Sequence, residues 1–271
     1  MWADSCPASH VPRAGAAGSG TERMRAAIRP AIDVTAPRTS PQSDIRVERT
    51  EYRRRVFVKI CGTTSEADAL LAVAMGADAV GFVFAPSPRQ IAPGVASDIA
   101  KRLPPEVMTV GVFRDEAPSR VVEIVNGVGL RAAQLHGHET ADQAHWVRQR
   151  VPFLIQAFAA GSPAVDKAAE YGADVVMLDA PRPGSGQIFD WTMAEVPDGL
   201  RLMLAGGLNP DNVAEAIARV HPWGVDVVTG VERSPGVKDP VKVRAFVKAA
   251  RAAEEPEYEP TAPGPFDQDD R

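Results

Sequence analysis

Gly76-Ala77-Asp78-Ala79-Val80 recurs as Gly172-Ala173-Asp174-Val175-Val176, and more loosely as Gly224-Val225-Asp226-Val227-Val228. In the first two copies, a glycine that can stop a helix precedes an apolar run typical of a new strand. The aspartates lie 96 and then 52 residues apart, which suits four and two repeating units of about 25 residues. Together with the flanking units, the repeat predicts eight strand and helix pairs with equivalent junctions.

Short runs rich in Val, Ile and Phe alternate with longer alanine-rich stretches of helical period over residues 56 to 252, which is typical of a parallel sheet covered by helices. We predict a compact (β/α)₈ TIM barrel, for which about 200 residues is the low end of the size range. An open, doubly wound sheet is the alternative, because alternation alone does not show closure. Thr63 and Glu66 resemble a capping box that opens a helix running to Met75. The expected strands are Val56–Cys61, Ala79–Phe84, Met108–Phe113, Ala132–His136, Phe153–Ala157, Val175–Asp179, Leu202–Ala205 and Gly224–Val228.

The two ends of the chain differ in composition from this repeating part. Residues 1–54 lack sustained hydrophobic periodicity, and residues 253–271 form an acidic, proline-rich tail. Neither segment has the apolar content needed to build a core, so both extensions are predicted to be disordered. The barrel is therefore expected to span residues 55–252.

The whole chain has 271 residues, a hydrophobic fraction of 45% and a formal net charge of −5. This balance excludes nucleic acid and an anionic membrane as the expected partners, and no apolar run is long enough to cross a bilayer. With only Cys6 and Cys61, a disulfide framework is not expected, which favours the reducing cytoplasm. An organelle transit peptide stays open for the Arg-, Ala-, Pro- and Ser-rich leader, although its acidic residues argue against it.

The stretch Val56-Phe57-Val58-Lys59-Ile60-Cys61-Gly62-Thr63-Thr64 is an apolar strand that ends in a thiol, a glycine and two hydroxyls. Because side chains alternate along a strand, Phe57, Lys59 and Cys61 share one face. The ammonium of Lys59 is expected to favour the thiolate of Cys61 and to bring its pKa towards neutrality, where proton abstraction is efficient. The alternative is a cysteine that acts as a small buried hydrophobe.

The ends of the expected strands carry unusually polar residues, and in a barrel all of them meet at one mouth. Glycines after the seventh and eighth strands would let backbone N–H groups approach a phosphate, although tight turns also explain them. His136 and His138 do not predict a metal site, because no carboxylate or cysteine stands at supporting spacing. The residues concerned are Cys61, Arg89, His136, Asp179, Gly206, Gly207, Thr229 and Gly230.

These motifs, taken in order, resemble phosphoribosylanthranilate isomerases of tryptophan biosynthesis over nearly all of residues 56 to 250. The two ends of the chain have no counterpart in the resemblance. The motifs are Lys59-Ile60-Cys61-Gly62-Thr63, Gly81-Phe82-Val83-Phe84 with Ser87-Pro88-Arg89, Gln134-Leu135-His136-Gly137, Leu178-Asp179 with Gly184-Ser185-Gly186 and Phe189-Asp190-Trp191, Ala205-Gly206-Gly207-Leu208-Asn209-Pro210-Asp211-Asn212-Val213, and Gly230-Val231-Glu232 with Gly236-Val237-Lys238-Asp239.

The resemblance implies an Amadori rearrangement of the phosphosugar N-(5-phosphoribosyl)anthranilate, without a cofactor. It implies that Asp179 is the general acid that opens the furanose ring and that Cys61 is the general base that takes the C2 proton. It also implies that Arg89 holds the anthranilate carboxylate, a task suited to a planar fork of donors. His136 either contacts the substrate or orients a loop. Asp226 is a candidate substrate-binding residue that could instead pair with Lys59 inside the barrel.

Two departures from the family pattern stand near the site. Val228-Thr229 replaces the usual pair of serines after the strand-eight aspartate, and Pro183 stands where a glycine is common. Phosphate binding through backbone amides should survive the first change, and a stiffer loop after Asp179 could slow turnover.

Several other functions remain alternatives. The bisubstrate isomerase of histidine and tryptophan synthesis uses an aspartate where this chain has Cys61. Thiamine phosphate synthase and indole-glycerol-phosphate synthase do not explain the Lys-Ile-Cys-Gly-Thr and Leu-Asp motifs together. A catalytically idle barrel that acts as an interaction module through the two long tails of the chain is disfavoured, because acid and base are both retained. The expected assembly is a monomer or a homodimer.

Overall fold

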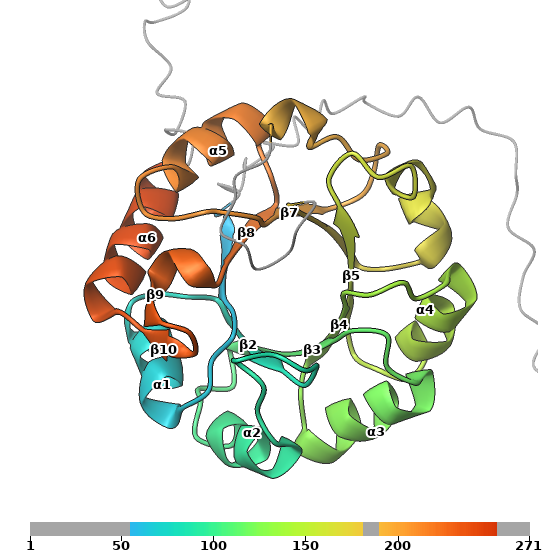
Figure 1. The fold of residues 1–271 in the computed structure, drawn as a ribbon, viewed down its shortest axis with the longest axis horizontal. Helices are drawn as coiled ribbons and strands as arrows, with labels where there is room; N and C mark the ends of the chain where they lie inside the picture. Colours follow the sequence, from blue (N-terminus) through green and yellow to red (C-terminus); the bar gives the residue numbers. More distant parts are fainter. Residues whose placement is uncertain (1–54, 181–189, 254–271) are drawn as a thin grey trace, which may run out of the picture. The chain divides into compact units, whose positions relative to one another are not determined.

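The computed structural model describes residues 55–180 and 190–253, and these form a closed barrel of eight parallel strands in the order β1 to β8 (Figure 1). Closure is direct, because β1 pairs with both β2 and β8. The TIM barrel predicted from the repeat is confirmed, and the open sheet is excluded. The strands are β1 Phe57–Ile60, β2 Ala79–Val83, β3 Met108–Phe113, β4 Ala132–Leu135, β5 Leu154–Ala159, β6 Val175–Asp179, β7 Leu202–Leu204 and β8 Gly224–Val227.

Helices surround the barrel and connect successive strands (Figure 1). Among the described residues, the helices on either side of β6 are short 3-10 helices rather than the α-helices that the alternation predicted. A two-stranded antiparallel hairpin follows β8 and was not predicted. The helices are α1 Glu66–Ala74, α2 Pro93–Ala100, α3 Pro118–Val128, α4 Ala141–Arg148, η1 Val165–Tyr171, η2 Trp191–Met193, α5 Val213–Val220, η3 Thr229–Val231 and α6 Pro240–Ala252, and the hairpin strands are β9 Glu232–Ser234 and β10 Val237–Lys238.

The helix cap expected at Thr63 is wrong. The N-cap of α1 is Ser65, whose hydroxyl accepts a hydrogen bond from the Asp68 N–H at 3.2 Å. The chain needs two further residues to leave the barrel rim, because the Thr63 N–H still bonds the carbonyl of Gly81 in β2. Thr63 is fully buried, and no partner for its hydroxyl is found among the described residues.

Two of the three repeated aspartates perform the same structural task at the amino ends of the strands. The Asp78 carboxylate accepts the N–H of Val58 at 2.8 Å, and the Asp78 N–H bonds the carbonyl of the same residue. Asp174 makes the same reciprocal pair with Leu154. Each aspartate therefore joins the strand that it precedes to the strand before it, and the repeat in the sequence reflects this shared contact.

The third copy of the repeat is not equivalent to the others. Gly76 and Gly172 have positive φ and lie before their strands, whereas Gly224 is the first residue of β8 and pairs with Phe57. The helix before β8 ends instead at His221, which adopts the left-handed conformation with φ of 48°. Asp226 consequently lies within the strand, facing the barrel interior, and not at a junction.

The apolar residues form two layers, one inside the barrel and one between the strands and the helices. At the amino end of the barrel, Phe57 stacks on Trp223 with ring centroids 4.5 Å apart. Polar side chains such as Lys59, Gln134 and Asp226 are buried higher in the interior. The packed amino end leaves the carboxyl end as the part of the barrel that can host chemistry.

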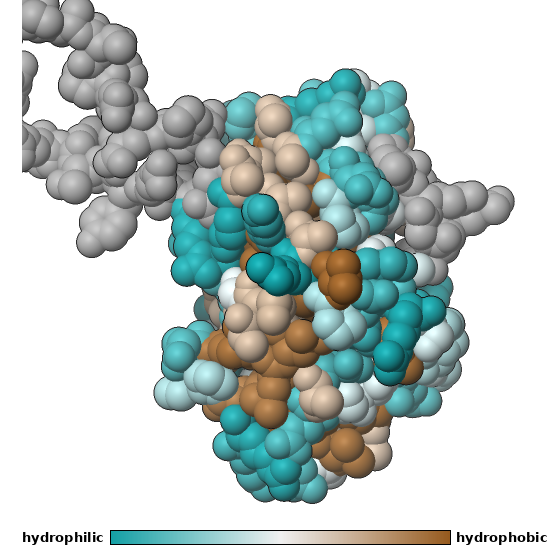
Figure 2. Space-filling model, turned by 90° about the vertical axis from the view of Figure 1, so that its left-hand side faces the viewer, coloured by the Kyte–Doolittle hydropathy of each residue, from teal (hydrophilic) through white to brown (hydrophobic). Residues whose placement is uncertain are grey.

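The outer surface is mixed in character. Figure 2 shows the side on which α5, α6 and α1 lie in Figure 1, where hydrophilic and apolar residues share one face. Leu70 on α1 and Val241 on α6 are exposed by 41% and 76%. Among the described helices, none has the length and apolar character needed to span a membrane.

The reciprocal aspartate contacts lead to a stability prediction. Replacing Asp174 with Ala leaves the Leu154 N–H without an acceptor and Arg148, 2.7 Å away, without its ion-pair partner. We expect a loss of about 2 kcal/mol in the free energy of unfolding, measured by urea denaturation. Asp166→Ala, an exposed acidic residue of η1, is the matched control. Equal stability of the two variants would show that the contact does not support the barrel.

Candidate active site

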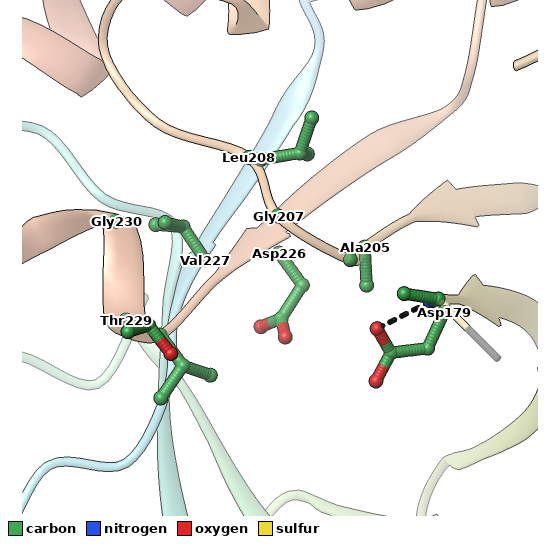
Figure 3. Close-up of a pocket in the computed structure, with 11 residues that line it drawn as sticks. Asp179, Ala205, Gly207, Leu208, Asp226, Val227, Thr229 and Gly230 are labelled. Carbon is green, nitrogen blue, oxygen red and sulfur yellow. Dashed lines mark hydrogen bonds between the residues drawn. The ribbon is translucent and has the colours of Figure 1, made fainter. Parts of the chain in front are cut away.

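A pocket opens at the carboxyl ends of β6, β7 and β8 (Figure 3). The Asp179 and Asp226 side chains project on the same side of the loop that follows β7. Six of the residues singled out from the sequence line this pocket, namely Asp179, Gly206, Gly207, Asp226, Thr229 and Gly230.

Two glycine turns, after β7 and after β8, line the pocket with backbone atoms. Gly206 and Gly207 have φ of 84° and 70°. A Cβ on Gly206 would lie 2.4 Å from the Ala180 nitrogen, and one on Gly230 would lie 2.0 Å from the Leu208 carbonyl oxygen. Only glycine therefore permits the β6, β7 and β8 loops to approach this closely.

Asn209 and Asn212 hold the turn after β7 in place. The Asn209 N–H donates to the Asn212 side-chain oxygen at 2.8 Å, and the Asn212 amide donates to the Gly207 carbonyl at 3.1 Å. Within the described part of the chain, the N–H groups of Gly206 and Gly207 have no acceptor. Two preorganised donors beside Thr229 and Gly230 suit an anion such as a phosphate.

Asp179 ends β6 and is almost completely buried. One of its carboxylate oxygens, Oδ1, accepts the N–H of Ala180 at 2.7 Å, and the other, Oδ2, lies 3.2 Å from the His136 Nε2 atom. The Gln134 amide nitrogen lies 3.1 Å from the His136 Nδ1 atom and donates to it in this orientation. The His136 Nε2 atom is buried and makes no hydrogen bond within the described residues, so it is close to Asp179 without bonding it.

The loop that carries His136 is braced by Glu139. Its buried carboxylate accepts the N–H groups of Asp115 at 2.9 Å and Gly137 at 2.8 Å, so the loops after β3 and β4 share one acceptor. His138 is exposed beside Asp115. Across residues 55–180 and 190–253, no cluster of His, Cys, Asp and Glu side chains could hold a metal ion.

Lys59 lies at the seam of the barrel and connects Cys61 to the pocket. Its ammonium is fully buried and bonds the Asp226 carboxylate at 2.7 Å, across neighbouring strands that pair these two residues in register. Burial lowers the pKa of Lys59, but Asp226 and Cys61 outweigh it and the net shift is upward. The pairing of Lys59 with Asp226 considered from the sequence is confirmed.

The expected effect of Lys59 on the thiol is only part of what the structure shows. Burial raises the pKa of Cys61, Lys59 lowers it, Asp226 raises it, and the net direction is upward. The prediction that the pKa of Cys61 moves towards neutrality is therefore wrong in direction. A strand pattern reveals the neighbouring ammonium, but it does not reveal the depth of burial or the carboxylate on β8.

Arg89 lies on the loop after β2 and already has a carboxylate partner. Its guanidinium donates two hydrogen bonds to Glu232, at 2.8 and 2.7 Å. Its aliphatic stem passes over Gly62, where a Cβ would come within 2.7 Å of the Arg89 Cδ atom. Glu232 is held in turn by Lys238 at 3.1 Å. Both residues stand in a sequence motif of the predicted family resemblance, but the motif predicted a role for neither.

Val228, one of the departures from the expected pattern, lines the pocket and packs beside Gly62. Pro183, the other, lies outside the described residues, as do residues 1–54 and 254–271 of the two extensions predicted to be disordered.

Comparison with known proteins places this geometry in a family. Residues 58–249 match the family model of N-(5'phosphoribosyl)anthranilate (PRA) isomerase. An N-(5'-phosphoribosyl)anthranilate isomerase of Desulforudis audaxviator is 50% identical over 205 residues, which cover 73% of this chain and 98% of the relative.

Solved structures agree with the sequence match. The phosphoribosyl anthranilate isomerase of Thermus thermophilus superposes with a TM-score of 0.69 at 42% identity, covering 73% of this chain and 99% of that one. A second isomerase, solved in complex with reduced 1-(o-carboxyphenylamino)-1-deoxyribulose 5-phosphate, gives a TM-score of 0.65 at 40% identity, with coverages of 73% and 99%.

The space beside Cys61 yields a prediction about Gly81. A Cβ on Gly81 would lie 2.6 Å from the Cys61 sulfur and 3.1 Å from the Lys59 nitrogen, both deeply buried. We expect Gly81→Ala to destabilise the fold by about 1–3 kcal/mol, because the core has no room for the added methyl group. Gly127→Ala in α3, which meets nothing within 4 Å, should leave stability unchanged or raise it. Urea denaturation of both variants checks this, and a stable Gly81→Ala would contradict it.

Proposed function

Since the chain belongs to the N-(5'-phosphoribosyl)anthranilate isomerase family, we propose that it converts N-(5-phosphoribosyl)anthranilate into 1-(2-carboxyphenylamino)-1-deoxyribulose 5-phosphate in tryptophan biosynthesis. The reaction is an Amadori rearrangement, which turns an aldosamine into a ketosamine. An acid must open the sugar ring, and a base must move a proton from carbon. The cytoplasmic location, the barrel boundaries at 55 and 252 and the choice between monomer and homodimer stay predictions.

The proposed acid is Asp179. In its protonated, carboxylic acid form it gives its proton to the furanose ring oxygen as the bond from that oxygen to C1 breaks, and the nitrogen lone pair forms the iminium. The Ala180 N–H fixes one carboxylate oxygen, and His136 stands 3.2 Å from the other. The Ala180 contact fixes the orientation of the carboxyl group, and the His136 imidazole lies beside the oxygen that this contact leaves open.

The proposed base is Cys61, acting as the thiolate. It removes the proton from C2, and the electron pair passes through C1 to the iminium nitrogen to give an enolamine. The enolamine takes a proton at C1 and its C2 hydroxyl becomes the ketone, so no redox cofactor is consumed. The observation that carries this assignment is the buried Lys59 ammonium, which bonds the pocket-lining Asp226 at 2.7 Å and opposes the rise in the pKa of Cys61 that burial causes.

The two ends of the substrate would be held by different means. The phosphate would accept hydrogen bonds from the free N–H groups of Gly206 and Gly207, with Thr229 and Gly230 opposite. Arg89 would hold the anthranilate carboxylate with the guanidinium donors that Glu232 does not occupy. Glu232 thus fixes the plane of the Arg89 fork before the substrate arrives.

Acid and base assignments are tested by single substitutions. Cys61→Ala and Asp179→Asn should each lower kcat by at least about a hundredfold, because each removes a proton-transfer group. A coupled assay, in which anthranilate phosphoribosyltransferase supplies the labile substrate and its fluorescence loss is followed, gives the rate. Circular dichroism and thermal melts show whether the variants remain folded. A folded variant with near wild-type kcat would remove that residue from the mechanism.

Arg89 is expected to act mainly in binding. Arg89→Ala should weaken binding of reduced 1-(o-carboxyphenylamino)-1-deoxyribulose 5-phosphate by at least about tenfold, because a charge-assisted fork is lost. Arg89→Lys keeps the positive charge but loses the planar fork of donors, so its dissociation constant should lie between those of the wild type and Arg89→Ala. Isothermal titration measures the dissociation constant at fixed ionic strength. Arg114→Ala, an exposed arginine after β3, is the matched control, and an unchanged constant for Arg89→Ala would exclude carboxylate recognition by Arg89.

A further inference from the structure

The β9–β10 hairpin brings a second buried lysine, Lys238, to the end of β1, where Cys61 lies. Figure 1 places this hairpin beside α6 and α1. Lys238 is 1% exposed, and its ammonium donates to the Cys61 carbonyl at 2.5 Å and to Glu232 at 3.1 Å. Its own N–H bonds Asp68 of α1 at 3.3 Å, so the backbone around Lys238 is also anchored.

Glu232 is the centre of this arrangement. One carboxylate oxygen accepts hydrogen bonds from Lys238 and from the Arg89 Nε atom, and the other accepts from the second Arg89 donor. The Gly236 N–H adds a contact at 3.2 Å, and Lys242 bonds the Glu232 carbonyl at 3.0 Å. Burial opposes the charge on Glu232, but Arg89 and Lys238 outweigh it and keep the pKa of Glu232 below its usual range.

The charges around Cys61 oppose the rise in its pKa that burial causes. Three cationic side chains, Lys59, Arg89 and Lys238, meet two carboxylates, Asp226 and Glu232. The cluster therefore carries one excess positive charge when Cys61 is a thiol and none when it is a thiolate. Asp68 and Lys242, of opposite sign, approach the hairpin from outside this cluster and leave the balance unchanged.

The carbonyl contact adds a geometric effect to this charge. Cys61 follows β1 directly, and its N–H bonds the Val227 carbonyl of β8 at 2.9 Å. With Lys238 holding its carbonyl oxygen, both backbone polar groups of Cys61 are fixed from other parts of the chain. The thiol is therefore attached to a backbone that is held in place independently of the loop that follows Cys61.

Resting on the function proposed above, we propose that Lys238 is a positioning residue for Cys61, fixing its backbone and supplying the second positive charge that favours its thiolate. Glu232 holds Lys238 in place and links it to Arg89. The base and the carboxylate-binding arginine are thereby joined into one unit by residues of the hairpin.

The test compares the titration of the Cys61 thiol in three variants of the full-length protein. Thiolate absorbance in the ultraviolet is followed against pH, and the curve of Cys61→Ser is subtracted so that Cys6 cancels. Lys238→Met removes the cation at similar length and should move the midpoint upward by about one pH unit or more. Glu232→Gln keeps the shape but removes a negative charge, so it should move the midpoint downward. Lys248→Met, at an exposed position of α6, should leave it unchanged.

Activity gives a second readout. In Lys238→Met, kcat at neutral pH should fall about tenfold or more and recover as the pH is raised, because the thiolate is then restored. A purely structural lysine would lower the melting temperature without moving the thiol midpoint, and that result would overturn the proposal. If Lys238→Met fails to fold, an unmoved midpoint in Glu232→Gln overturns it instead. The titration needs no turnover, so an active Cys61→Ala would defeat the catalytic assignment and leave the effect of Lys238 on the thiol separately measurable.

Discussion

The ion pair between Lys59 and Asp226 is the interaction on which the rest of the site depends. It lies where the first and last strands of the barrel meet, and the two residues are partners in the register of that seam. A buried ammonium or carboxylate without its partner costs several kcal/mol, so each strand provides what the other needs. Barrel closure and the placement of a positive charge beside Cys61 are therefore one structural event.

The mouth of the barrel is divided into two chemically different halves. On the side of β7 and β8, glycine turns offer backbone N–H groups, and side chains are excluded by contacts as short as 2.0 Å to an added Cβ. On the side of β1 and β2, charged side chains are held by one another, as Arg89, Glu232 and Lys238 illustrate. Backbone N–H donors can bind a phosphate without help from neighbouring side chains. Side chains that are linked to one another hold their donors and acceptors in fixed directions, which suits proton transfer and carboxylate binding.

Much of the fold could be predicted, because strand position depends on local patterns. The strands β3 and β6 begin and end where expected, and the others differ by at most two residues at either end. The repeat at Asp78 and Asp174 correctly indicated a shared structural contact. Asp226 shares their sequence motif but not that contact. The hairpin escaped prediction because Glu232–Lys238 reads as a polar loop, and its burial comes from contacts with Cys61 and Arg89 far away in the sequence. The direction of the Cys61 pKa was misjudged for the same reason, since burial is a property of the whole barrel.

The contact between Lys238 and Cys61 joins residues 177 positions apart in the chain. During synthesis, the first strand leaves the ribosome long before the hairpin that completes its surroundings. Until β8 emerges, the thiol lacks the Asp226 strand beside it and the amino-terminal half holds an unpaired strand edge, and the hairpin follows only after β8. The active site is consequently assembled last, so a chain truncated before β9 contains both proposed catalytic residues and lacks the framework that holds the base.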